Sequence, residues 1–231
     1  MNWLLRGLLL AGGMFIVLAG WQVMRGAYYA QQADAVSGKL WSGRKISVGE
    51  VRAAIASFDR AVAAEPSARR YLQRSEFLAG AALIPTTPVP PPERTGLLHR
   101  ADSDLKRGLA DAPARTTDWL RLAVVRQALN GSSRDVLPPL LMSLDTGLMM
   151  SPIWRVRTRI ILDNWAYFTE AQKEKLRDHV VTMWRRAPDR RWFGWIVYEQ
   201  QVDELILRDL LRDEPNAKEE LSRWIRDTNR R

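Results

Sequence analysis

The sequence predicts an all-α protein with a single N-terminal transmembrane helix followed by a helical domain. Three observations predict this fold class: an apolar run near the N-terminus, helix-capping signals, and prolines that follow helical stretches. No stretch keeps the apolar–polar alternation of a strand for long. At 231 residues, 46% of them hydrophobic, the chain can hold a membrane anchor and one ordinary domain.

The first element is the apolar run Gly7–Met24, which is bounded by Arg6 and Arg25 and flanked by tryptophans. Its length approaches the roughly 20 residues that cross a hydrocarbon core. The following segment, Ala27–Ser37, contains no helix breaker. We therefore expect one continuous helix to leave the membrane and to pack against the helix that begins near Val48.

A cleaved signal peptide is the alternative interpretation of this run. It requires small residues at the first and third positions before the cut. The nearest such pair, Ala33 and Ala35, lies too far beyond Met24, so we expect residues 1–25 to stay as an anchor. The anchor should lie in the inner (cytoplasmic) membrane of a bacterial cell, with residues 26–231 in the periplasm, because a large domain can be translocated whatever its charge.

Capping boxes and a proline-rich stretch organise residues 26–231. Ser47-Val48-Gly49-Glu50 and Thr169-Glu170-Ala171-Gln172 each place a hydroxyl three residues before a carboxylate or amide, as a capping box requires. The segment Ile84–Glu93 (IPTTPVPPPE) predicts an extended loop, because proline fixes φ and has no N–H to donate. We interpret residues 84–95 as an insertion within one domain.

A spaced set of residues recurs ahead of four prolines. Each set has an apolar residue, a second apolar residue four positions later, a usually small one after three more, and proline after a further five. The sets are Ala54-Phe58-Ala61-Pro66, Ala101-Leu105-Gly108-Pro113, Leu140-Leu144-Gly147-Pro152 and Leu176-Val180-Met183-Pro188. The first three positions share one helix face, where a small residue lets a neighbouring helix approach closely.

This pattern resembles the second helix of tetratricopeptide repeats, most closely in residues 51–68. Trp119, Leu122 and Ala123 resemble the signature of the first helix. With Pro215 as the fifth, the terminal prolines are spaced by 47, 39, 36 and 27 residues, which departs from the steady period of the family. The resemblance implies a tetratricopeptide-like α-solenoid of helical hairpins, and an irregular helical bundle is the alternative.

The resemblance also implies a binding groove, because the first helix of each tetratricopeptide pair lines a concave surface that holds a peptide. Counted from the terminal prolines, the groove residues and their neighbours are Arg74, Phe77, Arg121, Val124, Arg159 and Asp163. An arginine column can bind carboxylates or phosphates through paired hydrogen bonds. An ordinary exposed face is the alternative.

An aromatic cluster near the C-terminus, Trp192, Trp195 and Tyr198, lies among arginines. Such a cluster is typical of a carbohydrate-stacking surface or of a contact with a membrane surface. We favour core packing, because Trp192 and Trp195 fit one helical stripe with Val202 and Leu205.

Catalytic and metal-binding patterns are missing from the sequence. The chain has no cysteine, its two histidines (His99 and His179) lack ligand spacing, and it contains no phosphate loop or nucleophile elbow. We therefore expect no metal, no cofactor and no enzymatic activity. The net charge of +9 is spread over helices of mixed charge, which argues against nucleic acid and leaves anionic polysaccharide or lipid as ligands.

These patterns favour a membrane-anchored scaffold or adaptor that holds a protein partner near the inner membrane. The design is similar to that of anchored tetratricopeptide accessory proteins of secretion, cytochrome maturation and surface-polysaccharide assembly or export. The expected partner is an integral membrane or envelope complex of such a machine. The alternative is a glycan-binding module or a small carbohydrate-active enzyme that uses the Trp192–Tyr198 cluster.

Overall fold

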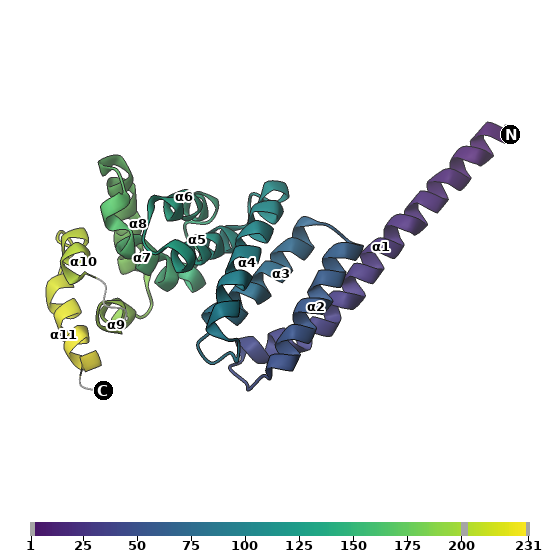
Figure 1. Ribbon diagram of the computed structural model, residues 1–231. Helices are drawn as coiled ribbons and strands as arrows, with labels where there is room; N and C mark the ends of the chain where they lie inside the picture. The colour runs from purple at the N-terminus through teal and green to yellow at the C-terminus, as the bar shows by residue number, and fades with distance from the viewer. Residues whose placement is uncertain (1–2, 200–202, 230–231) are drawn as a thin grey trace. The chain divides into compact units, whose positions relative to one another are not determined.

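A computed structural model of the chain describes residues 3–199 and 203–229, and the described residues are all-helical (Figure 1). Helix accounts for 81% of them, and they contain no strand. The α-helices are α1 (Trp3–Trp41), α2 (Val48–Ala64), α3 (Ala68–Leu83), α4 (Pro91–Asp111), α5 (Thr116–Asn130), α6 (Leu137–Thr146), α7 (Trp154–Asp163), α8 (Glu170–Arg186), α9 (Arg191–Glu199), α10 (Glu204–Leu210) and α11 (Ala217–Asn229). Short 3-10 helices lie at Arg134–Val136, Ser151–Ile153 and Trp165–Tyr167.

The chain divides into two compact units, Met1–Pro113 (unit 1) and Ala114–Arg231 (unit 2). Unit 1 contains α1 to α4, and unit 2 contains α5 to α11. The sequence predicts a boundary after residue 25 and none near Pro113. In the structure residue 25 lies inside α1, which continues to Trp41 without a break.

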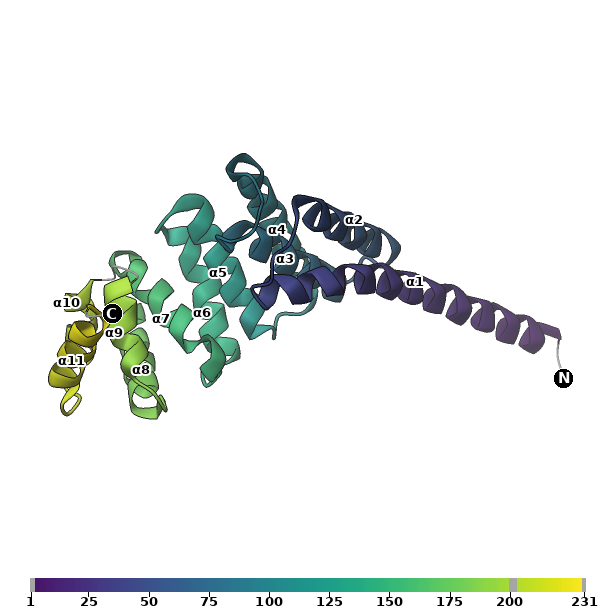
Figure 2. The same ribbon diagram turned by 90° about the horizontal axis from the view of Figure 1, so that it is seen from below.

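Helix α1 consists of an uncovered half and a packed half. Every residue of Gly7–Met24 is exposed, and the first buried residue of the helix is Gly26. Figures 1 and 2 show this N-terminal half extending away from the other helices of unit 1. By length and composition, α1 is the one helix in residues 3–199 and 203–229 that could cross a membrane.

The packed half of α1 forms an antiparallel pair with α2. Lys39 Nζ lies 2.5 Å from Glu50 Oε1 near one end of the pair, and the Arg60 guanidinium lies 5.2 Å from the centre of the Tyr29 ring further along it. Between these contacts, apolar side chains of the two helices share one core: Ala30, Ala33, Leu40, Val51, Ala54 and Phe58. The prediction that one continuous helix becomes the first partner of α2 is confirmed.

Both predicted capping boxes are present. At the start of α2, the Glu50 N–H donates to Ser47 Oγ at 3.1 Å, and the Ser47 N–H donates back to the Glu50 carboxylate at 2.8 Å. At the start of α8, Thr169 and Gln172 make the same reciprocal pair. These bonds satisfy N–H groups that have no partner inside the helix, so they fix where each helix begins.

The proline-rich loop is shorter than the sequence predicts. Helix α3 ends at Leu83 and α4 begins at Pro91, so residues 91–95 belong to the first turn of α4 and not to an insertion. Proline suits the first turn of a helix because the N–H it lacks would have no partner there. Arg94 anchors the loop by donating to the carbonyls of Val89 at 3.0 Å and Thr87 at 3.1 Å.

The recurring residue sets mark the buried faces of α2, α4, α6 and α8. All of the apolar members ahead of the prolines are buried, and among the glycines Gly108 is buried and Gly147 half-buried. A Cβ added at Gly108 would lie 2.6 Å from Leu72, and one at Gly147 would lie 2.5 Å from Thr116. Neighbouring segments therefore approach closely at these small residues, as the pattern predicts.

Unit 2 contains two clusters of buried apolar residues. One is contributed mainly by α5 to α8 and includes Leu120, Ala123, Leu140, Leu144, Ile161 and Leu176. The other joins α7 and α8 to the C-terminal helices and is centred on Trp184. The Trp184 ring lies 5.1 Å from the Phe193 ring and 5.5 Å from the Trp224 ring, which ties α9 and α11 to α8.

Candidate functional site

The point where α1 extends beyond the other helices of unit 1 lies beside a buried arginine. Arg70, 2% exposed, donates from Nε to Glu65 Oε2 at 2.6 Å and from Nη1 to Gln73 Oε1 at 2.8 Å. A Cβ added at Gly26 would lie 2.6 Å from Glu65 Cβ. Since a buried charge needs a paired carboxylate, this ion pair ties the end of α2 to the start of α3, and Gly26 of α1 lies close against it.

Sequence reasoning missed Arg70, although a signal for it existed. Arg70 shares a helix face with Phe77 and Ala81, because the three are spaced at seven and four residues. Phe77 and Ala81 are both buried in the core of unit 1. A buried partner for Arg70 could have been expected from this face, whereas the adjacent Arg69 is exposed.

Arg74, the first of the predicted groove arginines, lies in an ion-pair network inside unit 1. Its Nε and Nη2 each lie 2.7 Å from a carboxylate oxygen of Asp104, and Nη1 lies 2.9 Å from Asp59. Hydrogen bonding to Asp104 raises the pKa of Arg74 above its ordinary value. Asp104 is 4% exposed, so this pair links α3 to α4.

Arg121 and Arg159, the other two groove arginines, both belong to unit 2 and both face carboxylates. Arg121 pairs with the buried Asp118 on its own helix, and Arg159 Nε lies 3.4 Å from Asp163. Asp163 also accepts a hydrogen bond of 2.7 Å from Gln127, which connects α7 to α5. Arg159 thus extends a polar network between these two helices.

The two apolar groove residues are placed differently. Phe77 is 1% exposed and stacks against Phe58, so its assignment to a groove surface is wrong. The reason is that this face of α3 packs on α2, where the ring fills the core. Val124 is half-buried against the core of α5 to α8 and keeps part of its side chain at the surface.

The aromatic cluster of α9 is divided between core and surface. Trp195 is 37% exposed and Tyr198 is 42% exposed, whereas Trp192 stacks on Phe193 with ring centres 3.8 Å apart. The Arg155 guanidinium lies 5.7 Å from the centre of the Trp195 ring. The two exposed rings and Arg155 form a small cationic–aromatic surface of the kind that sugars or peptides can contact.

The expectation of core packing is confirmed for Trp192, which packs against the buried cluster that contains Trp184, and is wrong for Trp195. The buried stripe of α9 is Phe193, Ile196 and Val197. Both stripes are apolar in the sequence, so periodicity alone could not separate them. Leu205 is 74% exposed and belongs to a different helix, α10, and Val202 lies outside the described residues.

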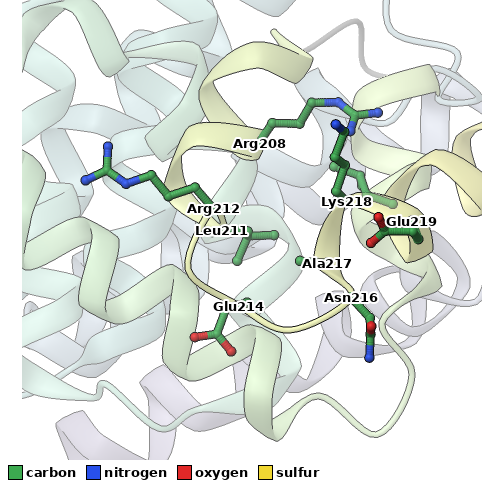
Figure 3. Close-up of a pocket in the computed structure, with 9 residues that line it drawn as sticks. Arg208, Leu211, Arg212, Glu214, Asn216, Ala217, Lys218 and Glu219 are labelled. Carbon is green, nitrogen blue, oxygen red and sulfur yellow. The ribbon is translucent and has the colours of Figure 1, made fainter.

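A cavity of about 360 Å³ lies beside α10 and the start of α11 (Figure 3). Its charged lining residues are Arg208, Arg212, Glu214, Lys218 and Glu219. Three of them are paired: Arg208 with Glu204 at 2.5 Å, Arg212 with Asp209 at 3.2 Å, and Glu214 with Arg185 at 2.6 Å. Among the described lining residues, none is a nucleophile beside a base.

A second buried arginine lies in unit 2 beside His179. Arg157, fully buried, donates to the Ser143 carbonyl at 2.8 Å and to the Gly147 carbonyl at 3.2 Å, and burial lowers its pKa to about 10. Burial and the charge of Arg157 lower the pKa of His179 to about 3. The ring is therefore neutral at physiological pH. Neither ring nitrogen of His179 has a hydrogen-bond partner.

The described residues contain no group of three or more His, Asp or Glu side chains that could hold a metal ion. Comparison of the chain with protein-family models, with curated proteins and with solved structures found no match.

Proposed function

We propose that this protein is a membrane-anchored scaffold that holds a protein partner beside the inner membrane of a bacterial cell. The observation that carries the proposal is α1. Its N-terminal half is apolar and uncovered, and its C-terminal half is part of the core of unit 1. A continuous helix transmits position and orientation from the membrane to a folded unit, which a flexible linker does not.

A tetratricopeptide-like arrangement of hairpins is part of this proposal. It is supported by the buried residue sets and by neighbouring helices that pack as pairs: α1 with α2, α3 with α4, and α5 with α6. Arg121, Arg159 and the partly exposed Val124 are the proposed partner contacts within unit 2. A partner that offers a carboxylate could add to the Arg159–Asp163 network, where the arginine side chain is 47% exposed.

In this proposal the N-terminus is cytoplasmic and the two units are periplasmic. The partner is a protein of an envelope machine for secretion, cytochrome maturation or surface-polysaccharide assembly. Anchoring raises the local concentration of the scaffold near a membrane-embedded partner, so modest contacts are sufficient for capture.

Site-specific photo-crosslinking in living cells tests this function. A photoreactive residue at Arg159 should yield a discrete crosslinked partner, and the same residue at the exposed Glu170 serves as the matched control in unit 2. Replacing the span by a cleavable signal peptide should greatly reduce the product. Equal products at both positions, or an undiminished product without the span, would contradict the proposal.

A glycan-binding module is the second candidate, and the exposed Trp195 and Tyr198 rings favour it. Aromatic rings bind sugars by stacking on their apolar faces. If this module is the working site, Trp195→Ala should abolish binding to isolated envelope polysaccharide and Arg159→Gln should not change it. Unchanged binding by Trp195→Ala would exclude this surface.

A further inference from the structure

The α2–α3 turn lies beside the exact part of α1 where the apolar span ends. The last apolar residue of the run, Met24, is two residues before Gly26, which contacts Glu65 of the turn. Two residues of helix rise about 3 Å. Within unit 1, the turn is therefore level with the boundary of the span (Figure 1).

The length of the span fixes where this boundary lies in a bilayer. An α-helix over Gly7–Met24 is about 27 Å long, close to the roughly 30 Å thickness of a hydrocarbon core. The headgroup layer adds roughly 5–7 Å on each side. If α1 crosses the membrane, Gly26 and the α2–α3 turn lie within that layer.

The side chains at this end of unit 1 suit a headgroup layer. Arg25 and Arg69 are exposed, and Tyr28 is 59% exposed. Gly108 packs the last turns of α4 closely against the start of α3. In the same turns, the exposed Arg107 guanidinium lies 5.7 Å from the centre of the Tyr71 ring. Arginine and tyrosine are the residues that favour the interface between lipid and water.

At the same end of unit 1, the positively charged side chains outnumber the unpaired carboxylates. Glu65 is engaged with Arg70, and Asp102 lies 2.5 Å from Lys106. The exposed Asp111 at the end of α4 is the remaining acidic side chain there. This surface therefore carries three exposed arginines, Arg25, Arg69 and Arg107, against one acidic side chain that has no cationic partner.

We propose that the α2–α3 end of unit 1 lies in the phospholipid headgroup layer, with Arg25, Arg69 and Arg107 facing lipid phosphates. This inference rests on the proposed insertion of α1. The contact would hold unit 1 upright on the membrane, since the turn packs closely against α1 at Gly26. The occupant of this surface is the bilayer and not a protein.

The test uses single-cysteine variants of the full chain, which has no native cysteine. Fluorophores are placed at Pro66→Cys in the turn, at Ala110→Cys in the last turn of α4, at Ser42→Cys and at Ile16→Cys. Ser42 is the control, because it lies about 24 Å further along α1 from Gly26. Each protein is reconstituted in phospholipid nanodiscs that carry a nitroxide either on the headgroup or on the acyl chain.

The headgroup nitroxide should quench positions 66 and 110 several-fold more than position 42, and the acyl-chain nitroxide should quench position 16. Changing Arg69 and Arg107 to glutamate should reduce quenching at position 66, whereas changing Arg44 and Lys45, at the opposite end of unit 1, should not. If the Arg69 and Arg107 changes leave quenching at position 66 unaltered, these arginines do not face lipid phosphates and this part of the proposal is overturned.

Two other outcomes separate this inference from the anchor itself. Strong acyl-chain quenching at position 16 with equally weak headgroup quenching at 66, 110 and 42 would refute the surface contact and leave the anchor intact. No acyl-chain quenching at position 16 would refute both the anchor and the contact.

Discussion

The ring of Phe58 lies 5.4 Å, centre to centre, from the ring of Phe77, and this contact joins α2 to α3 inside the core of unit 1. Both side chains are at most 3% exposed. The first residue was expected in the core and the second in a groove. Their contact shows that the face of α3 that carries Phe77 is covered by α2.

Phe58→Ala should lower the free energy of unfolding by about 3–5 kcal/mol, because it removes a buried ring and leaves a cavity beside Phe77. Urea unfolding of the full chain in detergent, followed by circular dichroism, measures the loss. Ala56→Ser on the exposed face of the same helix is the control and should change stability by less than about 0.5 kcal/mol. An unchanged midpoint for Phe58→Ala would refute the packing of α2 on α3.

Gly26→Ala should destabilise unit 1, because its Cβ would lie 2.6 Å from Glu65 Cβ and the α2–α3 turn would have to shift. Gly38→Ala is the matched control on the same helix, since its Cβ meets nothing within 4 Å. Alanine at 38 should be neutral or stabilising by up to about 1 kcal/mol, from its greater helix propensity. Limited proteolysis at the α2–α3 turn should increase only for Gly26→Ala; equal behaviour of the two variants would contradict the close approach.

Arg74→Ala should cost about 3–5 kcal/mol, because it leaves the buried carboxylate of Asp104 without a cation. Arg69→Ala, on the exposed face of the same helix, should cost less than about 0.5 kcal/mol. Comparison of the two urea midpoints decides whether Arg74 supports the fold. If Arg74→Ala is as stable as Arg69→Ala, then Arg74 is free to bind a partner, as the repeat resemblance implies.

Acid should destabilise unit 2 through His179. Its pKa is lowered from the ordinary 6.5 to about 3, so the unfolded chain binds the proton more readily than the folded one. The stability present above pH 6.5 should therefore fall by roughly 1.4 kcal/mol per pH unit below it, or about 2 kcal/mol at pH 5.

Tryptophan fluorescence measures this loss, because Trp184 lies in the buried cluster of unit 2. His179→Leu has no proton to bind and should show a shallower dependence of stability on pH between 6.5 and 5. The same slope in both proteins would show that His179 is not the group that titrates.

Local signals in the sequence predicted most of the helices. Ser47 and Glu50 fixed the start of α2, and the small residue Gly108 marked a close helix approach, because these effects act within one or two turns of helix. Phe77 and Trp195 were misplaced because each lies next to a second apolar face of its helix. Which face is buried depends on neighbours that are distant in sequence.

The buried Arg157 and the division after Pro113 also depend on tertiary packing. No pattern within a few residues of Arg157 distinguishes it from the exposed Arg155, which is two positions away. The candidate site was harder to predict than the fold, because the groove residues were carried over from a resemblance and not from contacts.

The proposed membrane anchor is the N-terminal half of α1, whose C-terminal half packs in unit 1. Alkaline carbonate extraction of membranes, followed by peptide mass mapping, tests this anchor most directly. We expect the protein to stay in the pellet and to yield peptides covering Gly7–Met24, since apolar burial does not depend on ion pairs. A soluble chain that lacks these peptides and begins beyond Met24 would contradict it.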